Sequence, residues 1–233
     1  MNKDINNQDR LIVALDVPTV SAAKDMVERL GDVVSFYKIG LELFMSGEYF
    51  ELLDWLKSKH KKVFIDLKFF DVPATVGRAI KQLNGKGVTF ATIHGNDSIM
   101  RAAAENKGDV QVLAVTVLTS LDRGDLDDLG FECEVDKLVL SRAKRAVELG
   151  CDGVVASGLE APMMRENLGH NFLIVSPGIR PVDNDDDQKR VVTVEKAFEN
   201  GADYIVIGRP IRDAVDPKAA AEAIQSQIVN SLS

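Results

Sequence analysis

Cysteine is scarce in this sequence, and long apolar runs are missing. The two cysteines among the 233 residues, Cys133 and Cys151, form no C-x-x-C pattern. This excludes a disulfide framework and a cysteine-based zinc site, and we expect both side chains to pack as small apolar groups. No run approaches the roughly 20 apolar residues of a transmembrane helix. Because residues 1–10 also lack the basic and apolar regions of a secretory signal, we predict a cytoplasmic protein without a membrane partner.

Positive charge and histidine are also in short supply. The chain has 28 Lys and Arg against 36 Asp and Glu, a net charge of −8, which argues against a nucleic-acid-binding surface. The three histidines, His60, His94 and His170, are scattered and show no paired-ligand spacing, so they predict no metal site. What remains, 45% hydrophobic and 27% charged residues, is typical of a globular protein with a sizeable core.

Short apolar runs rich in β-branched residues recur along the whole chain. Each is nearly continuous in apolar character, which is typical of parallel strands covered on both faces. The expected strands are 11–17, 34–41, 63–69, 90–94, 110–118, 153–157, 172–176 and 204–208. Helical spacing is found between them, at 21–30, 48–58, 76–83, 97–105, 136–149, 159–168, 194–200 and 217–227. Thr193 and Asp216 are the expected N-caps of the last two helices.

Eight strands alternating with eight helices predict a single-domain (β/α)₈ TIM barrel over residues 1–233. Residues 1–10 would be a polar N-terminal extension. A doubly wound open sheet also alternates strands and helices, but it usually has fewer strands, and no G-x-G-x-x-G follows any strand here. The barrel is therefore the favoured fold.

Charged residues gather where the first three expected strands end, which is where TIM barrels place their working groups. Asp16 ends the first strand, Lys38 lies on the second, and Asp66 and Lys68 lie on the third with Asp71 just beyond. Alternate residues of a strand share a face, so Asp66 and Lys68 are expected to point together into the barrel mouth. Burial of charge requires pairing, and Lys38, Asp66, Lys68 and Asp71 would form a neutral set. An isolated pair would indicate only a structural ion pair. Four such groups favour chemistry, with a protonated lysine as donor.

The last two strands end in a pattern typical of a phosphate site. Gly178 and Arg180 follow the seventh strand, and Gly208 and Arg209 follow the eighth. Backbone N–H groups at these strand ends bind phosphate in many TIM barrels, and an arginine can hold two phosphate oxygens. The acidic loop 181–190 between them is predicted to cover the phosphate.

The segment Asp66-Leu67-Lys68-Phe69-Phe70-Asp71-Val72-Pro73-Ala74-Thr75 strongly resembles the signature of the orotidine 5′-phosphate decarboxylase family, which usually reads D-L-K-F-H-D-I-P-N-T. The resemblance runs essentially end to end and is to the bacterial branch. It also includes Val13-Ala14-Leu15-Asp16, Lys38-Ile39-Gly40, Ala114 to Ser120, Ser176-Pro177-Gly178-Ile179-Arg180 and Val206-Ile207-Gly208-Arg209-Pro210. Phe70 and Ala74 depart from the usual His and Asn.

The resemblance implies the last step of de novo UMP synthesis, in which orotidine 5′-monophosphate is converted to UMP and CO₂ without a cofactor or metal. It implies that Lys68 protonates C6 of the pyrimidine, that Asp66 and Asp71 flank the departing carboxylate, and that Lys38 completes the array. It also implies a homodimer in which Asp71 and Thr75 reach the neighbouring site. The implied substrate-binding residues are Asp16, Lys38, Asp66, Thr75, Thr119, Arg180, Gln188, Gly208 and Arg209.

Two other functions stay open at this point. A Mg²⁺-dependent sugar-phosphate lyase of the same barrel superfamily also uses an Asp-x-Lys strand followed by Asp. A non-catalytic nucleotide-phosphate binding protein could use the same scaffold. The string from Asp66 to Thr75, with Thr119, favours the decarboxylase over the lyase. The intact charged set argues against a mere binder, because carboxylates would face an anionic ligand.

Overall fold

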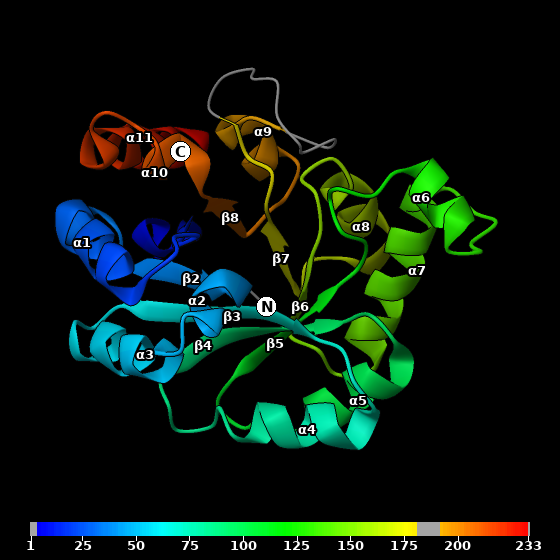
Figure 1. Ribbon diagram of the computed structural model, residues 1–233. Coiled ribbons are helices and arrows are strands. Elements are labelled where there is room, and N and C mark those ends of the chain that lie inside the picture. The colour runs from blue at the N-terminus through cyan, green and yellow to red at the C-terminus, as the bar shows by residue number, and fades with distance from the viewer. Residues whose placement is uncertain (1–3, 181–191, 233) are drawn as a thin grey trace.

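The eight strands pair in chain order, and β8 returns to β1, so that the sheet closes into a parallel barrel (Figure 1). The computed structural model describes residues 4–180 and 192–232. Closure is made by β1 and β8, where Leu11 pairs with Ile205 and Val13 with Ile207. The strands are β1 (Leu11–Ala14), β2 (Phe36–Gly40), β3 (Lys62–Phe69), β4 (Val88–His94), β5 (Gln111–Val115), β6 (Gly153–Val155), β7 (Leu173–Ser176) and β8 (Tyr204–Ile207). The predicted TIM barrel is confirmed.

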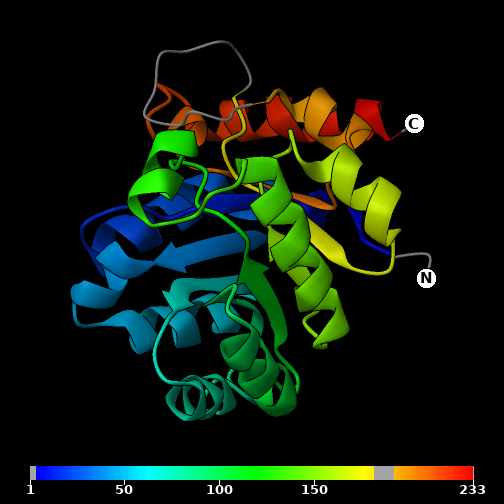
Figure 2. The same ribbon diagram turned by 90° about the vertical axis from the view of Figure 1, so that its right-hand side faces the viewer.

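Helices form the outer layer around this barrel in both ribbon views (Figures 1 and 2). The helices in the described part of the chain are α1 (Val20–Leu30), α2 (Leu41–Met45), α3 (Tyr49–Ser58), α4 (Pro73–Lys81), α5 (Asp97–Asn106), α6 (Arg123–Asp128), α7 (Val135–Glu148), α8 (Ala161–Leu168), α9 (Val194–Glu199), α10 (Arg209–Arg212) and α11 (Pro217–Ser231). Thr193 and Asp216 cap α9 and α11 as predicted, accepting from the backbone N–H groups of Lys196 and Ala219. Of the helices in the described part of the chain, none is long and apolar enough to cross a membrane.

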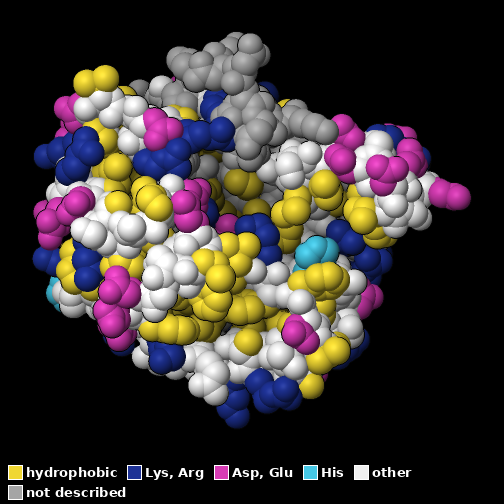
Figure 3. Space-filling view, in the orientation of Figure 1, with side chains coloured by type: hydrophobic (Ala, Val, Ile, Leu, Met, Phe, Trp, Pro, Cys, Tyr) yellow, Lys and Arg dark blue, Asp and Glu magenta, His cyan; other side chains and the backbone are white. Residues whose placement is uncertain are grey.

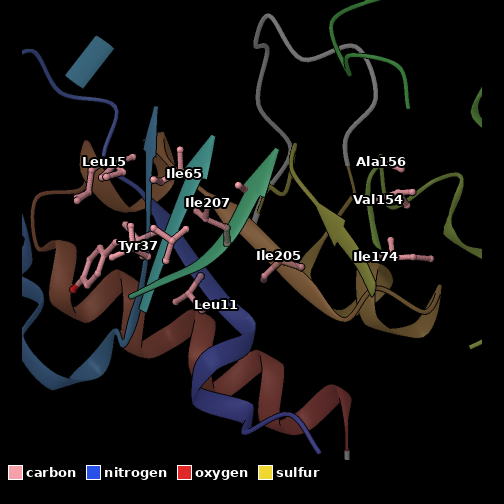
Figure 4. Close-up of a cluster of buried hydrophobic side chains, with 14 of the residues drawn as sticks. Leu11, Leu15, Tyr37, Ile65, Val154, Ala156, Ile174, Ile205 and Ile207 are labelled. Carbon is pink, nitrogen blue, oxygen red and sulfur yellow. The ribbon is translucent and has the colours of Figure 1, made fainter. Parts of the chain in front are cut away.

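Alternation along the strands separates two apolar clusters. Leu11, Tyr37 and Ile65 face outward and pack under the helices in the larger cluster, part of which is shown in Figure 4. Inward-facing residues form a second cluster inside the barrel, with Ile12 and Ala14 among its members. The barrel therefore has a packed interior and not an open pore.

Four aromatic rings fill the barrel interior below its mouth. The ring of Phe90 lies 5.1 Å from that of Phe36 and 5.1 Å from that of Tyr204, and Phe64 meets it edge-on at 5.8 Å. From the N-terminal segment, Ile5 packs against the same cluster. The short 3₁₀ segment η1 (Asn7–Arg10) then leads into β1. These rings fill the interior toward the amino end of the strands, and the cavity with its polar side chains lies toward the carboxyl end.

Candidate active site

A cavity of about 300 Å³ lies at the carboxyl end of the barrel. Figure 3 shows a hollow on this face in which Lys and Arg side chains lie close to Asp and Glu side chains. Its lining includes residues predicted for the site: Asp16, Lys38, Asp66, Lys68, Thr119, Arg180, Gly208 and Arg209. Six different strands thus bring their ends to one hollow, as the barrel topology requires.

Alternating charges form a continuous chain along one wall of the cavity. The ammonium Nζ of Lys38 lies 2.9 Å from Asp16 Oδ1 and 3.6 Å from Asp66 Oδ2. The ammonium Nζ of Lys68 lies 2.9 Å from the same Asp66 Oδ2. Asp66 is therefore held between two cations, and its side chain is only 13% exposed. Such pairing is what makes burial of these charges tolerable.

The neighbouring charges keep Asp66 and Lys38 ionised. Burial by itself would raise the pKa of Asp66, but the ammonium groups of Lys38 and Lys68, with hydrogen bonds from Lys68 and Thr92, hold that pKa below its ordinary value. Burial would likewise lower the pKa of Lys38, and the carboxylates of Asp66 and Asp16 outweigh it and raise that pKa. At neutral pH the wall therefore presents a fixed anion beside a fixed cation.

The end of β3 departs from a regular strand. Its pairing with β4 passes from Ile65 opposite Ala91 directly to Phe69 opposite Ile93. Three residues, 66–68, thus oppose the single residue Thr92, and Lys68 takes a left-handed backbone with φ of 48°. For a residue with a Cβ this conformation costs about 1–2 kcal/mol. Bulges of this kind re-aim side chains beside active sites, and here both charged side chains of the segment reach the cavity.

Asp71 and Thr75 are not brought to the cavity of their own chain. Asp71 is exposed, and its Oδ1 accepts a hydrogen bond from the backbone N–H of Val72 at 2.6 Å. The Thr75 hydroxyl accepts from Arg78 Nη2 at 3.2 Å. The structure therefore differs from the predicted neutral set, because Asp16 and not Asp71 is the second carboxylate of the cluster.

The expected phosphate end is brought together at β7 and β8. Gly178 has a φ of 75°, a conformation that favours glycine, and it lines the cavity with Arg180. Arg180 is buried at 8% exposure, whereas Arg209 is exposed at the rim. Gln188 and the predicted covering loop 181–190 lie outside the described residues.

Two residues of the site were missed by sequence reasoning. Arg212 lines the cavity, and its Nη1 donates to the backbone oxygen of Asp16 at 2.7 Å. Its place one helical turn after Arg209 could have indicated it. Thr92 contacts both Asp66 and Lys68. The sequence could have indicated that it faces inward, because it follows the inward-facing Phe90 by two residues.

In residues 4–180 and 192–232 no group of three or more His, Cys, Asp and Glu side chains is arranged to hold a metal ion. His94 ends β4, and its imidazole Nδ1 lies 2.9 Å from Asn96 Oδ1. Its ring stacks on the exposed ring of Phe70 with centroids 4.4 Å apart. The departure from the family signature at Phe70 therefore places an aromatic contact at the rim of the mouth.

Comparison with known proteins places the chain among its relatives. Residues 9–224 match the model of the "Orotidine 5'-phosphate decarboxylase / HUMPS family". An orotidine 5′-phosphate decarboxylase of Methylococcus capsulatus is 69% identical over 97% of this chain and 95% of its own length. One from Stenotrophomonas maltophilia is 53% identical over 98% and 96%. The crystal structure of orotidine 5′-phosphate decarboxylase from Lactobacillus acidophilus is 36% identical, with a TM-score of 0.84 over 94% of this chain and 99% of that one.

Proposed function

This chain belongs to the orotidine 5′-phosphate decarboxylase / HUMPS family, and from that premise we propose that Lys68 protonates the C6 carbanion that is left when CO₂ departs from orotidine 5′-monophosphate. The activity is that of an orotidine 5′-phosphate decarboxylase, a carboxy-lyase of pyrimidine biosynthesis. The observation that supports the mechanism best is the Lys68 ammonium at the cavity wall, 2.9 Å from an ionised Asp66.

Fixed charge suits this reaction because the carbanion lies in the plane of the ring, where the π system cannot delocalise it. An ammonium already aimed at C6 stabilises the developing negative charge and then supplies the proton. Lys68 is held by a carboxylate and by an irregular backbone, so little reorganisation is needed as the charge develops. We propose that these charges act without a cofactor or metal.

Asp66 has a second proposed role beside the substrate carboxylate. Because its pKa is held low, it stays anionic and repels the bound carboxylate, and departure of CO₂ relieves this repulsion. Asp71, from the partner subunit, would add a second negative charge. Ground-state repulsion is secondary to transition-state stabilisation by Lys68 in this proposal.

The rest of the cavity fits the nucleotide. We propose that Asp16 and Lys38 bind the ribose hydroxyls and that Thr119 lies near the base. Phosphate would meet Arg180, Arg209 and the backbone at Gly208, and we also assign Gln188 to it, a residue that lies outside the described part of the chain. The single barrel domain would thus bind the phosphate at β7 and β8, and react at β2 and β3.

A homodimer explains why Asp71 and Thr75 lie away from their own cavity. The side chain of Asp71 is flanked by Phe70 and Val72, which are 66% and 63% exposed. Exposed apolar side chains beside functional ones are typical of an interface. We propose that a second copy covers this segment and receives Asp71 and Thr75 in its own site.

The activity is tested by following the loss of orotidine 5′-monophosphate absorbance with purified protein in excess EDTA, alongside Lys68→Ala. Rapid turnover that the substitution abolishes supports the metal-free mechanism. Turnover by wild type that survives in Lys68→Ala contradicts the role of Lys68. If CO₂ is released only from a keto-sugar phosphate with Mg²⁺, the sister lyase takes its place, and tight UMP binding without turnover would indicate a binding protein.

The shared site is tested by mixing two inactive variants, Lys68→Ala and Asp71→Ala, after allowing their subunits to exchange. A mixed dimer would have one intact site, so about a quarter of the wild-type activity should return when subunits pair at random. If no activity returns although mixed dimers form, Asp71 does not act across the interface.

A further inference from the structure

Thr92 lies on β4 opposite the bulge of β3. It is the one residue between the pairs Ile65–Ala91 and Phe69–Ile93, where β3 has three. Its side chain is 0% exposed. It is not among the residues that line the cavity, so a bound substrate would not touch it.

The hydroxyl of Thr92 is used in both directions. It donates to Asp66 Oδ1 at 2.9 Å and accepts from the backbone N–H of Lys68 at 2.9 Å. A hydroxyl has one donor and can accept as well. One side chain thus joins the carboxylate and the backbone of the two residues to which the mechanism assigns the chemistry.

One contact replaces a backbone bond that a regular strand would provide, and the other completes the contacts of the Asp66 carboxylate. The bulge takes Lys68 out of the regular ladder between β3 and β4, and a buried N–H without a partner is unfavourable. Its left-handed backbone, with φ of 48°, persists only where the surroundings hold it. On the other side, Lys38 and Lys68 both lie near Asp66 Oδ2, so Thr92 occupies the oxygen that they leave. The one hydroxyl thus contacts both the free oxygen of the Asp66 carboxylate and the backbone N–H of Lys68.

We propose that Thr92 is a positioning residue for decarboxylation, which fixes Lys68 and Asp66 relative to each other through a single hydroxyl group. This inference rests on the function proposed above for Lys68 and Asp66. The hydroxyl acts through those two residues and not on the nucleotide. Its loss therefore affects the chemical step more than binding.

The test compares Thr92→Val, which keeps the shape and removes the hydroxyl, with Thr92→Ser, which keeps the hydroxyl and removes a methyl group. We expect Thr92→Val to lower kcat about 10- to 100-fold, the effect of misplacing a catalytic group by about 1 Å. KM and the Kd for UMP should change much less, and Thr92→Ser should stay close to wild type. Near-UV circular dichroism and thermal unfolding establish that each variant is folded, and Thr92→Ala replaces Thr92→Val if the latter does not fold.

The pH profile gives a readout that a purely structural role would not move. Three groups contact the Asp66 carboxylate: Lys38 of β2, Lys68 of β3 and Thr92 of β4. Asp16 pairs with Lys38 and not with Asp66. The nearby Tyr49 hydroxyl of α3 donates to the backbone oxygen of Ile39. The bond from Thr92 lowers the pKa of Asp66. Its removal should move the acid limb of kcat to higher pH in Thr92→Val, and not in Thr92→Ser.

Two results would overturn the inference. The first is a Thr92→Val variant with the wild-type kcat. The second is a Thr92→Ser variant whose kcat falls as much as that of Thr92→Val, because the effect would then come from packing of the methyl group. Lys68→Ala in the same assay separates this from the proposed function. If Lys68→Ala is inactive and Thr92→Val is unimpaired, only the role of Thr92 fails; if Lys68→Ala is as active as wild type, the mechanism itself fails.

Discussion

Two groups of paired charged residues in this barrel differ in how far they are buried and in what surrounds them. Arg165 of α8 and Asp203, just before β8, pair at 2.7 Å, with side chains 8% and 12% exposed. The Arg165 guanidinium also donates to the backbone oxygens of Gly201 and Phe172, and Asp203 accepts from the N–H of Ile174. This pair is closed, because its hydrogen bonds go to the fold itself.

The group at the mouth is open by contrast. Asp16, Lys38, Asp66 and Lys68 pair with one another, yet all four line a cavity of about 300 Å³. Their charges are therefore held in place and still face the space where a nucleotide would lie. Pairing of charges therefore does not by itself indicate function. What distinguishes the mouth is that its charges can act on a ligand.

Breaking the closed pair should produce the largest change in stability. Asp203→Ala leaves the Arg165 guanidinium buried without its carboxylate, which should lower the free energy of unfolding by about 3–5 kcal/mol. The variant should keep the wild-type KM at temperatures where it stays folded, because Asp203 does not line the cavity. Urea unfolding measures the first quantity and initial rates the second. If the variant were as stable as wild type, the Arg165–Asp203 pair would not stabilise the fold as proposed.

Arg209→Ala tests the phosphate end of the open group. Arg209 is exposed at the rim, so the fold should be unaffected. A charged hydrogen bond contributes about 1.5–3 kcal/mol, so kcat/KM should fall about 10- to 150-fold. Arg101→Ala, on the exposed face of α5, changes the net charge equally and should leave kcat/KM near wild type. Equal losses in both variants would indicate only long-range attraction of the anionic substrate.

Asp66 should link the open group to pH. Its pKa is lowered in the folded state from 3.8, so its contribution to stability is present above that pH and is lost as the pH falls through the folded pKa. The difference in unfolding free energy between wild type and Asp66→Asn should therefore narrow as the pH falls from about 5 to 3. The control is Asp213→Asn, which removes an exposed carboxylate whose pKa is lowered by Arg212. Its unfolding free energy should differ little from that of wild type at any pH, because water screens the Asp213–Arg212 pair. If the difference in unfolding free energy between wild type and Asp66→Asn did not change with pH, this would contradict the lowered pKa of Asp66.

Phe70→His should have the smallest effect. It restores the residue usual in the family signature at a position 66% exposed, and an imidazole can still stack on His94. We expect the free energy of unfolding to change by no more than about 0.5 kcal/mol, as for most surface substitutions. A marked loss of kcat would show that the Phe70–His94 contact shapes the site.

Much of this architecture could be predicted from the sequence because parallel barrel strands are apolar on both faces, so that all eight gave a local signal. The helices α2, α6 and α10 were missed because they are short (five, six and four residues) and show too little of the helical period. The cluster of Asp16, Lys38, Asp66 and Lys68 followed from strand ends. The bulge of β3 could not be predicted, since it depends on pairing with β4, a segment more than 20 residues away.

The position of Asp71 shows a second limit. Spacing placed it just beyond Lys68 and suggested one cluster, but α4 begins at Pro73 and carries the segment away from the cavity. Under the proposed homodimer Asp71 would act in the site of a neighbouring molecule, which the pattern within one chain does not describe. The contacts of Thr92 could not be predicted either, because they depend on which residues of β3 lie opposite it.

We infer that the open group acts on the substrate and the closed pair on the fold. The most direct test of this is Lys68→Met, which removes the ammonium and keeps much of the side-chain length, with kcat and the free energy of unfolding measured on the same sample. We predict that kcat falls about 100- to 1,000-fold, on the order of removing a preorganised electrostatic group. The free energy of unfolding should change little, because Asp66 keeps Lys38 as a partner. A kcat within tenfold of wild type, or a loss of stability as large as that of Asp203→Ala, would contradict the account.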